Sequence, residues 1–482
     1  MIRHKTTTTY KMKYLLFTAT VFCAITFNSY GQDAPPNNQT YNFSVQDCIN
    51  YAYDHQTTVV NAALDIKSAE YKVKETTGIG LPQISGSASI QDYIKSPTQL
   101  FPDFISPLTY GVLAKEGVKD GNGNPIQVPS GNSLIPVTFT QKYNSNLGVT
   151  LNQILFDGSY LVGLKASKTY KELSLRSYTR SKIDANVAVT KAYYQVLVSD
   201  KQIKLLDANI LQLKQQLDQT VQQNKQGFVE KIDVDRITVQ YNNLVTNREN
   251  TIRLLALNYQ LLKFQMGMPV ENNLILKDNL EGINLNDNVA DVSADTTFYR
   301  NRIEYSLSET SLKLNELDLK RKKSTFLPSL TLNGSTALAF QNNSFGQLYN
   351  TSYPSTYFGV TLNVPLFSGG QRINQVRQSQ ITVLQSKNTL YNLKNQLTLQ
   401  ANQARVSYIN GLQSLNNQKN NQTLAQEVLR VAKVKYQQGV GSSIEVTQAQ
   451  TSLEDADNKY IQGLYDALVS KVDLDQAYGR IK

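Results

Sequence analysis

The chain has 482 residues, of which 40% are hydrophobic and 18% are charged, and its formal net charge is +10. That length is sufficient for a packed core or for several domains. No block of five like charges occurs, which argues against a nucleic-acid partner. The sequence contains only 2 histidines and 2 cysteines, which argues against zinc sites and histidine-based catalytic triads.

The N-terminal segment has the pattern of a secretory signal peptide. Lys11 and Lys13 precede an apolar run, and the small residues Ser29 and Gly31 follow it at the −3 and −1 positions. The run is about 14 residues long, short of the roughly 20 that a spanning helix needs. We therefore expect residues 1–31 to be a signal peptide that is cleaved after Gly31. Its removal would leave Cys48 as the only cysteine, so that no intrachain disulfide could form.

The remainder of the chain consists of two similar copies. Leu81-Pro82 recurs as Leu327-Pro328, Leu155-Phe156-Asp157-Gly158 as Leu366-Phe367-Ser368-Gly369, Gln226-Gly227 as Gln438-Gly439, and Gly267 as Gly479. The last three pairs lie 211 or 212 residues apart and the first 246 apart, because the first copy has extra residues between Pro82 and Phe156. The same order of motifs in both copies is typical of an internal repeat. We predict repeat 1 over residues 32–266, a linker over 267–298, and repeat 2 over 299–482.

Each copy predicts the order helix, strand, loop, strand, long helix, glycine turn, long helix. In repeat 1 the strands are expected at about 82–94 and 143–155, and the long helices at about 158–226 and 230–266. In repeat 2 the strands are expected at about 328–340 and 357–366, and the long helices at about 370–438 and 442–479. Repeat 1 also contains a long Pro- and Gly-rich loop, 95–142, between its two strands.

The long helices have a narrow apolar seam. No proline lies between Pro136 and Pro269 or after Pro365. The helix expected at 158–226 would be about 100 Å long at 1.5 Å per residue. Its apolar residues at 3/4 spacing are Ile203, Leu206, Ile210, Leu213, Leu217 and Val221. This spacing is typical of a coiled coil, and the polar residues on the other faces indicate water on both sides of a helical wall.

The expected strands have one apolar and one polar face. Leu147, Val149 and Leu151 interleave with Asn146, Thr150 and Asn152. This alternation suits the wall of a transmembrane β-barrel, although a half-buried sheet in a soluble domain has the same period. Four strands cannot close a barrel, since the smallest barrels use about eight. The chain is therefore expected to oligomerise, and the strand count alone leaves a dimer and a trimer open.

The order and duplication of these motifs resemble the TolC family of outer-membrane efflux and secretion channels. The resemblance is carried by Phe43-Ser44-Val45-Gln46-Asp47-Cys48, the Leu-Pro strand starts, Val364-Pro365-Leu366-Phe367-Ser368-Gly369-Gly370, and the turns at Gly227 and Gly439. It implies a mainly α protein with a small antiparallel β part. Each chain of a homotrimer would give four strands to a 12-stranded outer-membrane barrel and its long coiled-coil helices to a periplasmic α-barrel.

The resemblance also implies a function and a set of partners. The protein would be the exit duct of a tripartite efflux pump or a type I secretion system in a Gram-negative cell. It would conduct substrates passively from the periplasm to the exterior. It would contact outer-membrane lipid, a periplasmic adaptor (membrane fusion) protein, and an inner-membrane transporter of the RND, ABC or MFS type. No cofactor, metal, nucleic acid or enzymatic activity is expected.

The family's periplasmic gate can be carried over onto this sequence. Its two acidic constriction positions fall at Glu445 and Gln448, of which only the first is acidic. The polar links that hold the gate shut fall at Tyr436 and Asp233. The basic partner falls at Gly441, so that link is missing, and Lys231 or Arg236 could replace it. Iris-like dilation of the helix ends would open the gate.

The two glycine turns are expected to contact the adaptor. These turns comprise Gly227, Phe228 and Val229 in repeat 1 and Gly439, Val440, Gly441 and Ser442 in repeat 2. The glycines are also ordinary helix C-caps, Glu445 suits a solvated position near a helix N-terminus, and Tyr436 suits a seam position.

Two other classes of protein remain as alternatives. One is a periplasmic coiled-coil structural or adaptor protein of an export assembly, against which the alternating strands argue. The other is a secreted enzyme on a helical scaffold. The absence of a G-x-x-x-x-G-K-[ST] motif and of clustered catalytic residue types argues against that class.

Overall fold

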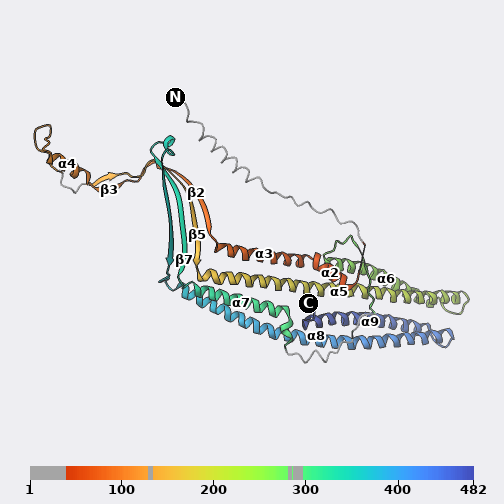
Figure 1. The fold of residues 1–482 in the computed structure, drawn as a ribbon. Helices are drawn as coiled ribbons and strands as arrows, with labels where there is room; N and C mark the ends of the chain where they lie inside the picture. Colours follow the sequence, from red (N-terminus) through yellow and green to blue (C-terminus); the bar gives the residue numbers. More distant parts are fainter. Residues whose placement is uncertain (1–39, 129–133, 281–284, 286–296, 482) are drawn as a thin grey trace.

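The computed structural model describes residues 40–128, 134–280, 285 and 297–481. The predicted signal peptide 1–31 lies outside the described residues, as do residues 281–284 and 286–296 of the predicted linker. A small β-sheet lies at one end of an elongated molecule. Two long helical hairpins run from it to the other end (Figure 1).

The main sheet contains one pair of strands from each repeat. Its order is β2 (Gln83–Asp92), β5 (Tyr143–Phe156), β7 (Ser329–Asn342) and β8 (Ser352–Asn363), and all neighbours are antiparallel. The first three strands lie within two residues of the predicted ranges. Within the chain, β2 and β8 are the edge strands.

The prediction for the fourth strand was displaced. The expected range was 357–366, whereas β8 begins at Ser352 and ends at Asn363. The ladder with β7 ends at the pair Ser329 and Asn363, and Pro365 beyond it has no N–H to donate. Pro354 lies inside β8, where its missing N–H removes at most one hydrogen bond from a ladder.

The long loop of repeat 1 has secondary structure that the sequence did not predict. Strands β3 (Gln99–Pro102) and β4 (Leu134–Val137) pair in antiparallel fashion, and helix α4 (Ile105–Lys115) lies between them in the chain. The loop projects beyond the end of the sheet (Figure 1).

Four long helices form the two hairpins. Helix α5 (Gly158–Lys225) turns into α6 (Lys231–Met266), and α8 (Gln371–Gln437) turns into α9 (Ser443–Ala477). All four lie within two residues of the predicted ranges. The shorter helices α3 (Thr57–Ile79) and α7 (Ile303–Ser324) pack against the sheet-proximal parts of the long ones. None of the described helices is both long and apolar enough to cross a membrane.

Each hairpin is held together by an apolar seam. Leu206, Leu213 and Leu217 of α5, which the 3/4 spacing predicted, pack with Ile237 and Leu244 of α6. In the second hairpin, the seam residues are Leu429 and Ala432 of α8 with Val446, Ala449 and Leu453 of α9. The remaining faces of these helices are largely polar, as in a coiled coil.

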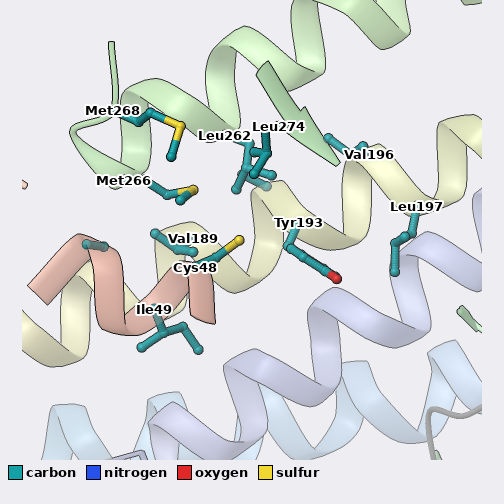
Figure 2. Close-up of a cluster of buried hydrophobic side chains, with 12 residues drawn as sticks. Cys48, Ile49, Val189, Tyr193, Val196, Leu197, Leu262, Met266, Met268 and Leu274 are labelled. Atoms are coloured by element: carbon teal, nitrogen blue, oxygen red, sulfur yellow. The ribbon is translucent and has the colours of Figure 1, made fainter. Parts of the chain in front are cut away.

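A cluster of buried hydrophobic side chains joins the start of repeat 1 to its long helices (Figure 2). Helix α2 (Val45–His55) contributes Cys48 and Ile49, which pack with residues of α5 and α6 and with Leu274 of β6 (Asn273–Leu276). Strand β6 pairs in parallel with β1 (Thr40–Phe43). The Tyr193 hydroxyl and the Val45 N–H both donate to Asp278 Oδ2, at 2.9 and 2.8 Å. These contacts fix the start of repeat 1 to the segment that follows α6.

Candidate functional site

One face of the four-stranded sheet is mainly apolar, with Thr336 and Thr356 between its apolar rows. The cross-strand register aligns Ile84, Leu151, Gly334 and Phe358 in one row, and Ala88, Leu147, Leu338 and Pro354 in another. Ile84 and Phe358 are 72% and 74% exposed in the isolated chain. The Phe358 ring lies over Gly334, where a Cβ would come within 2.8 Å of it. Apolar residues from both repeats thus combine into a single exposed surface.

The opposite face of the sheet is polar. One of its rows aligns Ser85, Thr150, Ser335 and Tyr357, and the next aligns Gln83, Asn152, Asn333 and Gly359. The hydroxyls of Ser85 and Thr150 hydrogen-bond at 2.7 Å, and Asn333 Nδ2 donates to Thr361 Oγ1 at 2.8 Å. Asp92, at the end of β2, is the only charged residue in the four strands. One apolar face and one polar face are typical of strands that separate lipid from water.

At the other end of the molecule, each hairpin turns through a glycine in the left-handed region. The φ angles are 80° at Gly227 and 73° at Gly439. The Phe228 N–H donates to Gln223 O at 2.9 Å, and the Val440 N–H donates to Lys435 O at 3.0 Å. These bonds close the ends of α5 and α8 as Schellman-type caps. Phe228 and Val440 are both 78% exposed, so each turn presents one large apolar side chain to its surroundings.

The structure places the two predicted constriction residues next to each other. Glu445 lies in the first turn of α9 and Gln448 one turn later, and both are exposed. They line one open groove between α8 and α9 together with Glu427 and Lys435. The Ser442 hydroxyl accepts from the Glu445 N–H at 3.2 Å, so Glu445 is also positioned by the N-cap of α9.

The predicted link residues Tyr436 and Asp233 also lie close together. The Asp233 carboxylate accepts a hydrogen bond from the Ser443 hydroxyl, not from Tyr436. Within the described residues, the Tyr436 hydroxyl is buried without a hydrogen-bond partner. Burial, and after it the nearby Asp233 carboxylate, raise the pKa of Tyr436. Of the two basic candidates, Arg236 contacts Asp233, with 3.5 Å between Nη1 and Oδ1.

Sequence reasoning missed two residues that join α6 to α9. Ser443 forms the bond to Asp233 and lies 3.5 Å from Arg236 Nη1. Two turns further along α6, Gln240 Nε2 donates to Thr447 O at 3.1 Å and lies 3.4 Å from Thr451 Oγ1. The only available signal was spacing: Gln240 lies seven residues after Asp233, on the same helix face. No group of three or more His, Cys, Asp or Glu side chains in the described residues is arranged to hold a metal ion.

The apolar sheet face, the hydrated helical hairpins and the paired turns define a subunit of an outer-membrane channel. The chain belongs to the outer membrane efflux protein family, whose model matches residues 49–256 and 293–480. The family is one of export channels rather than enzymes, and its place is the cell outer membrane.

Individual relatives agree with this assignment. The outer membrane protein TolC of Vibrio cholerae is 21% identical over 369 residues, covering 73% of this chain and 84% of its own length. The probable efflux pump outer membrane protein TtgC of Pseudomonas putida is 23% identical over 367 residues, 74% of each chain. The crystal structure of CusC superimposes with a TM-score of 0.71 at 16% identity, covering 94% of this chain and 95% of CusC.

Proposed function

We propose that three copies of this chain form one continuous exit duct for a tripartite efflux pump or a type I secretion system. The observation that carries the proposal is the cross-strand register, which collects the apolar residues of both repeats on one face of the sheet. If the apolar face of the sheet contacts lipid, its side chains are removed from water. The polar face would line a water-filled lumen that continues between the helices.

The open edges of the sheet support a closed assembly of several chains. In lipid, unpaired N–H and C=O groups along β2 and β8 would each cost several kcal/mol. Pairing β8 of one copy with β2 of the next satisfies both edges. Three copies give a 12-stranded barrel, the assembly that the resemblance to the TolC family implies.

The turn end of the hairpins is the proposed gate and docking site. Three copies of Glu445 would form a ring of carboxylates that attracts cations and resists anions. Gln448 would lie one helical turn from this ring. Asp233, Ser443 and Arg236 would hold the gate shut, with Tyr436 packed beside them. The turns at Gly227–Val229 and Gly439–Ser442 would receive a periplasmic adaptor that links the duct to an inner-membrane transporter.

Reconstitution in planar bilayers tests this proposal. The purified protein is expected to form water-filled pores that conduct ions without a nucleotide. Salt- and carbonate-washed membranes provide the control for location, since a barrel protein stays in the outer-membrane fraction. A protein that leaves the membrane on carbonate washing and forms no pores would instead match the alternative of a periplasmic coiled-coil structural or adaptor protein.

A further inference from the structure

The contact between the two hairpins changes its chemistry along α9. Near the middle of the molecule it is apolar, where Val198 of α5 packs with Ile461 and Leu464 of α9. From Asp457 to the turns, the interactions that join the hairpins are polar, whereas the seam inside each hairpin remains apolar almost to its turn. Each hairpin is therefore built to stay intact when its contact with the other hairpin is broken.

Asp457 lies at the point where the apolar contact ends. Its carboxylate is only 7% exposed. It accepts from Asn209 Nδ2 of α5 and from Gln422 Nε2 of α8, each at 2.7 Å. No cation among the described residues pairs with it. Amides from two helices, one in each repeat, thus hold a buried carboxylate on a third helix. Losing either amide would leave the charge under-solvated, which is costly in a buried site.

Glu454 lies one helical turn before Asp457 on α9, on the side of the hairpin turns. It is the second carboxyl group at this contact. Together with Asp457 and the amides of Gln202, Asn209 and Asn247, it lines a cavity with room for about one water molecule. Its Oε1 is buried and has no hydrogen-bond partner among the residues that the structure describes. Burial raises the pKa of Glu454, and the carboxylates of Asp455 and Asp457 on the same helix raise it further.

The charges around Glu454 all have the same sign. The cavity residues from α5 and α6 are uncharged: Gln202, Leu205, Leu206, Asn209, Leu244 and Asn247. From α8, Gln422 reaches Asp457 with an uncharged amide. Nothing in this surrounding favours the ionised form of Glu454 except the neighbouring amide of Gln450. A dry, closed contact therefore favours a proton on this carboxyl group.

We propose that Asp457, Asn209, Gln422 and Glu454 form a pivot cluster that locks the α8–α9 hairpin against α5 and sets how readily the gate opens. This inference rests on the proposed function, because it assumes that the helix ends separate when the duct opens. Separation of the hairpins breaks the bond from Asn209 to Asp457 and admits water to Glu454, whereas the bond from Gln422 stays within the α8–α9 hairpin and holds Asp457 in position. The pivot cluster lies far from the turns, so it acts on opening without touching the constriction.

The pivot cluster makes opening depend on pH, with a definite sign. In the closed state Glu454 has a raised pKa, and in the hydrated open state the pKa returns toward its ordinary value of 4.5. The closed state therefore binds a proton that the open state releases. As pH rises through the interval above 4.5, the closed state loses its advantage and the open fraction increases.

Single-channel recording on the reconstituted protein tests the role of Asp457. Asp457→Asn removes the charge that both amides contact and is expected to raise the ratio of open to closed time about tenfold, the effect of losing one charge-assisted hydrogen bond. Asp466→Asn is the matched control, because Asp466 is an exposed carboxylate on the same helix. Reversal of the pair, Asn209→Asp with Asp457→Asn, is expected to restore the wild-type ratio. Should Asp457→Asn fail to assemble, Asn209→Leu removes the amide that crosses between the hairpins and is expected to shift the ratio in the same direction.

The pH profile provides the second readout. The wild-type open fraction is expected to rise as the pH increases above 4.5, the ordinary pKa of a glutamate, and Glu454→Gln is expected to flatten that profile. Wild-type pores whose gating ignores both Asp457→Asn and pH would overturn the pivot cluster and leave the proposed function intact. A wild-type protein that forms no pores would contradict the proposed function itself.

Discussion

Two carboxylates near the hairpin turns, Glu445 and Asp233, have different surroundings. Glu445 is exposed at the start of α9, where an ionised side chain also interacts favourably with the helix dipole. Asp233 accepts a hydrogen bond from Ser443 across the two hairpins. Glu445 would be available to ions in the proposed lumen, whereas Asp233 is occupied by a contact within the protein.

At Glu445 we predict a change in ion selectivity without a loss of structure. Glu445→Gln removes one carboxylate per chain from the proposed constriction and is expected to lower cation selectivity and weaken block by divalent cations. Gln448→Glu adds a carboxylate ring and is expected to act in the opposite direction. Reversal potentials and block in planar bilayers provide the measurement. Glu309→Gln, at an exposed site on α7, is the control, and unaltered selectivity in both test variants would remove Glu445 from the gate.

Lys433 provides a prediction about stability. Burial lowers the pKa of this ammonium group from 10.5 to about 8. Between about pH 8 and pH 10.5 the unfolded chain therefore binds more protons than the folded one, and the stability that Lys433 contributes rises with pH over that interval. Lys433→Met is expected to raise the Tm at pH 7 and to remove this rise. Thermal denaturation at several pH values measures both effects, and a variant with the wild-type pH profile would contradict the prediction.

At the scale of elements, the contact between α6 and α9 depends on a few polar side chains. Ser443→Ala removes the donor to Asp233, and Gln240→Leu removes the amide that reaches Thr447. Each variant is expected to increase conductance several-fold by loosening the closed state, and the double variant more than either single one. Single-channel conductance provides the measurement. Thr423→Ala, which alters an exposed hydroxyl bonded only within α8, is the control and should behave as wild type.

The elements themselves were largely predictable, because their signals are local. Helix ends follow from Asp157, from the glycines at 227 and 439 and from the absence of proline, and strand faces follow from alternation. The start of β8 was misplaced because its pairing depends on the register with β7, which no local pattern encodes. The bond from Ser443 to Asp233 and the bonds to Asp457 were missed for a related reason. The bonds from Ser443 to Asp233 and from Asn209 to Asp457 join residues more than 200 positions apart. The bond from Gln422 to Asp457 depends on how α8 and α9 are rotated relative to each other, which packing determines.

At the scale of the whole molecule, the two faces of the sheet differ in what they tolerate. Val149 and Thr150 are neighbours on opposite faces of β5. Val149→Lys places a charge in lipid and is expected to destabilise the assembled protein by about 2–4 kcal/mol near the bilayer midplane. Thr150→Lys faces the lumen and is expected to alter conductance with little effect on assembly. Denaturant unfolding in lipid vesicles measures the difference, and equal destabilisation by the two variants would contradict the assignment of faces.

The same architecture explains why the chain should not function alone. A single copy leaves both edges of the sheet open and exposes its apolar face. The proposed ring of copies would pair the edges and present that face to lipid. The helical hairpins follow the strands directly, so closure of the sheet also closes the helical wall.

The mass of the detergent-solubilised particle, measured by light scattering with the detergent contribution subtracted, tests the central claim most directly. A particle of three chains that resists dissociation in mild detergent is expected. A stable particle of one chain, with its sheet edges unpaired, would contradict that claim.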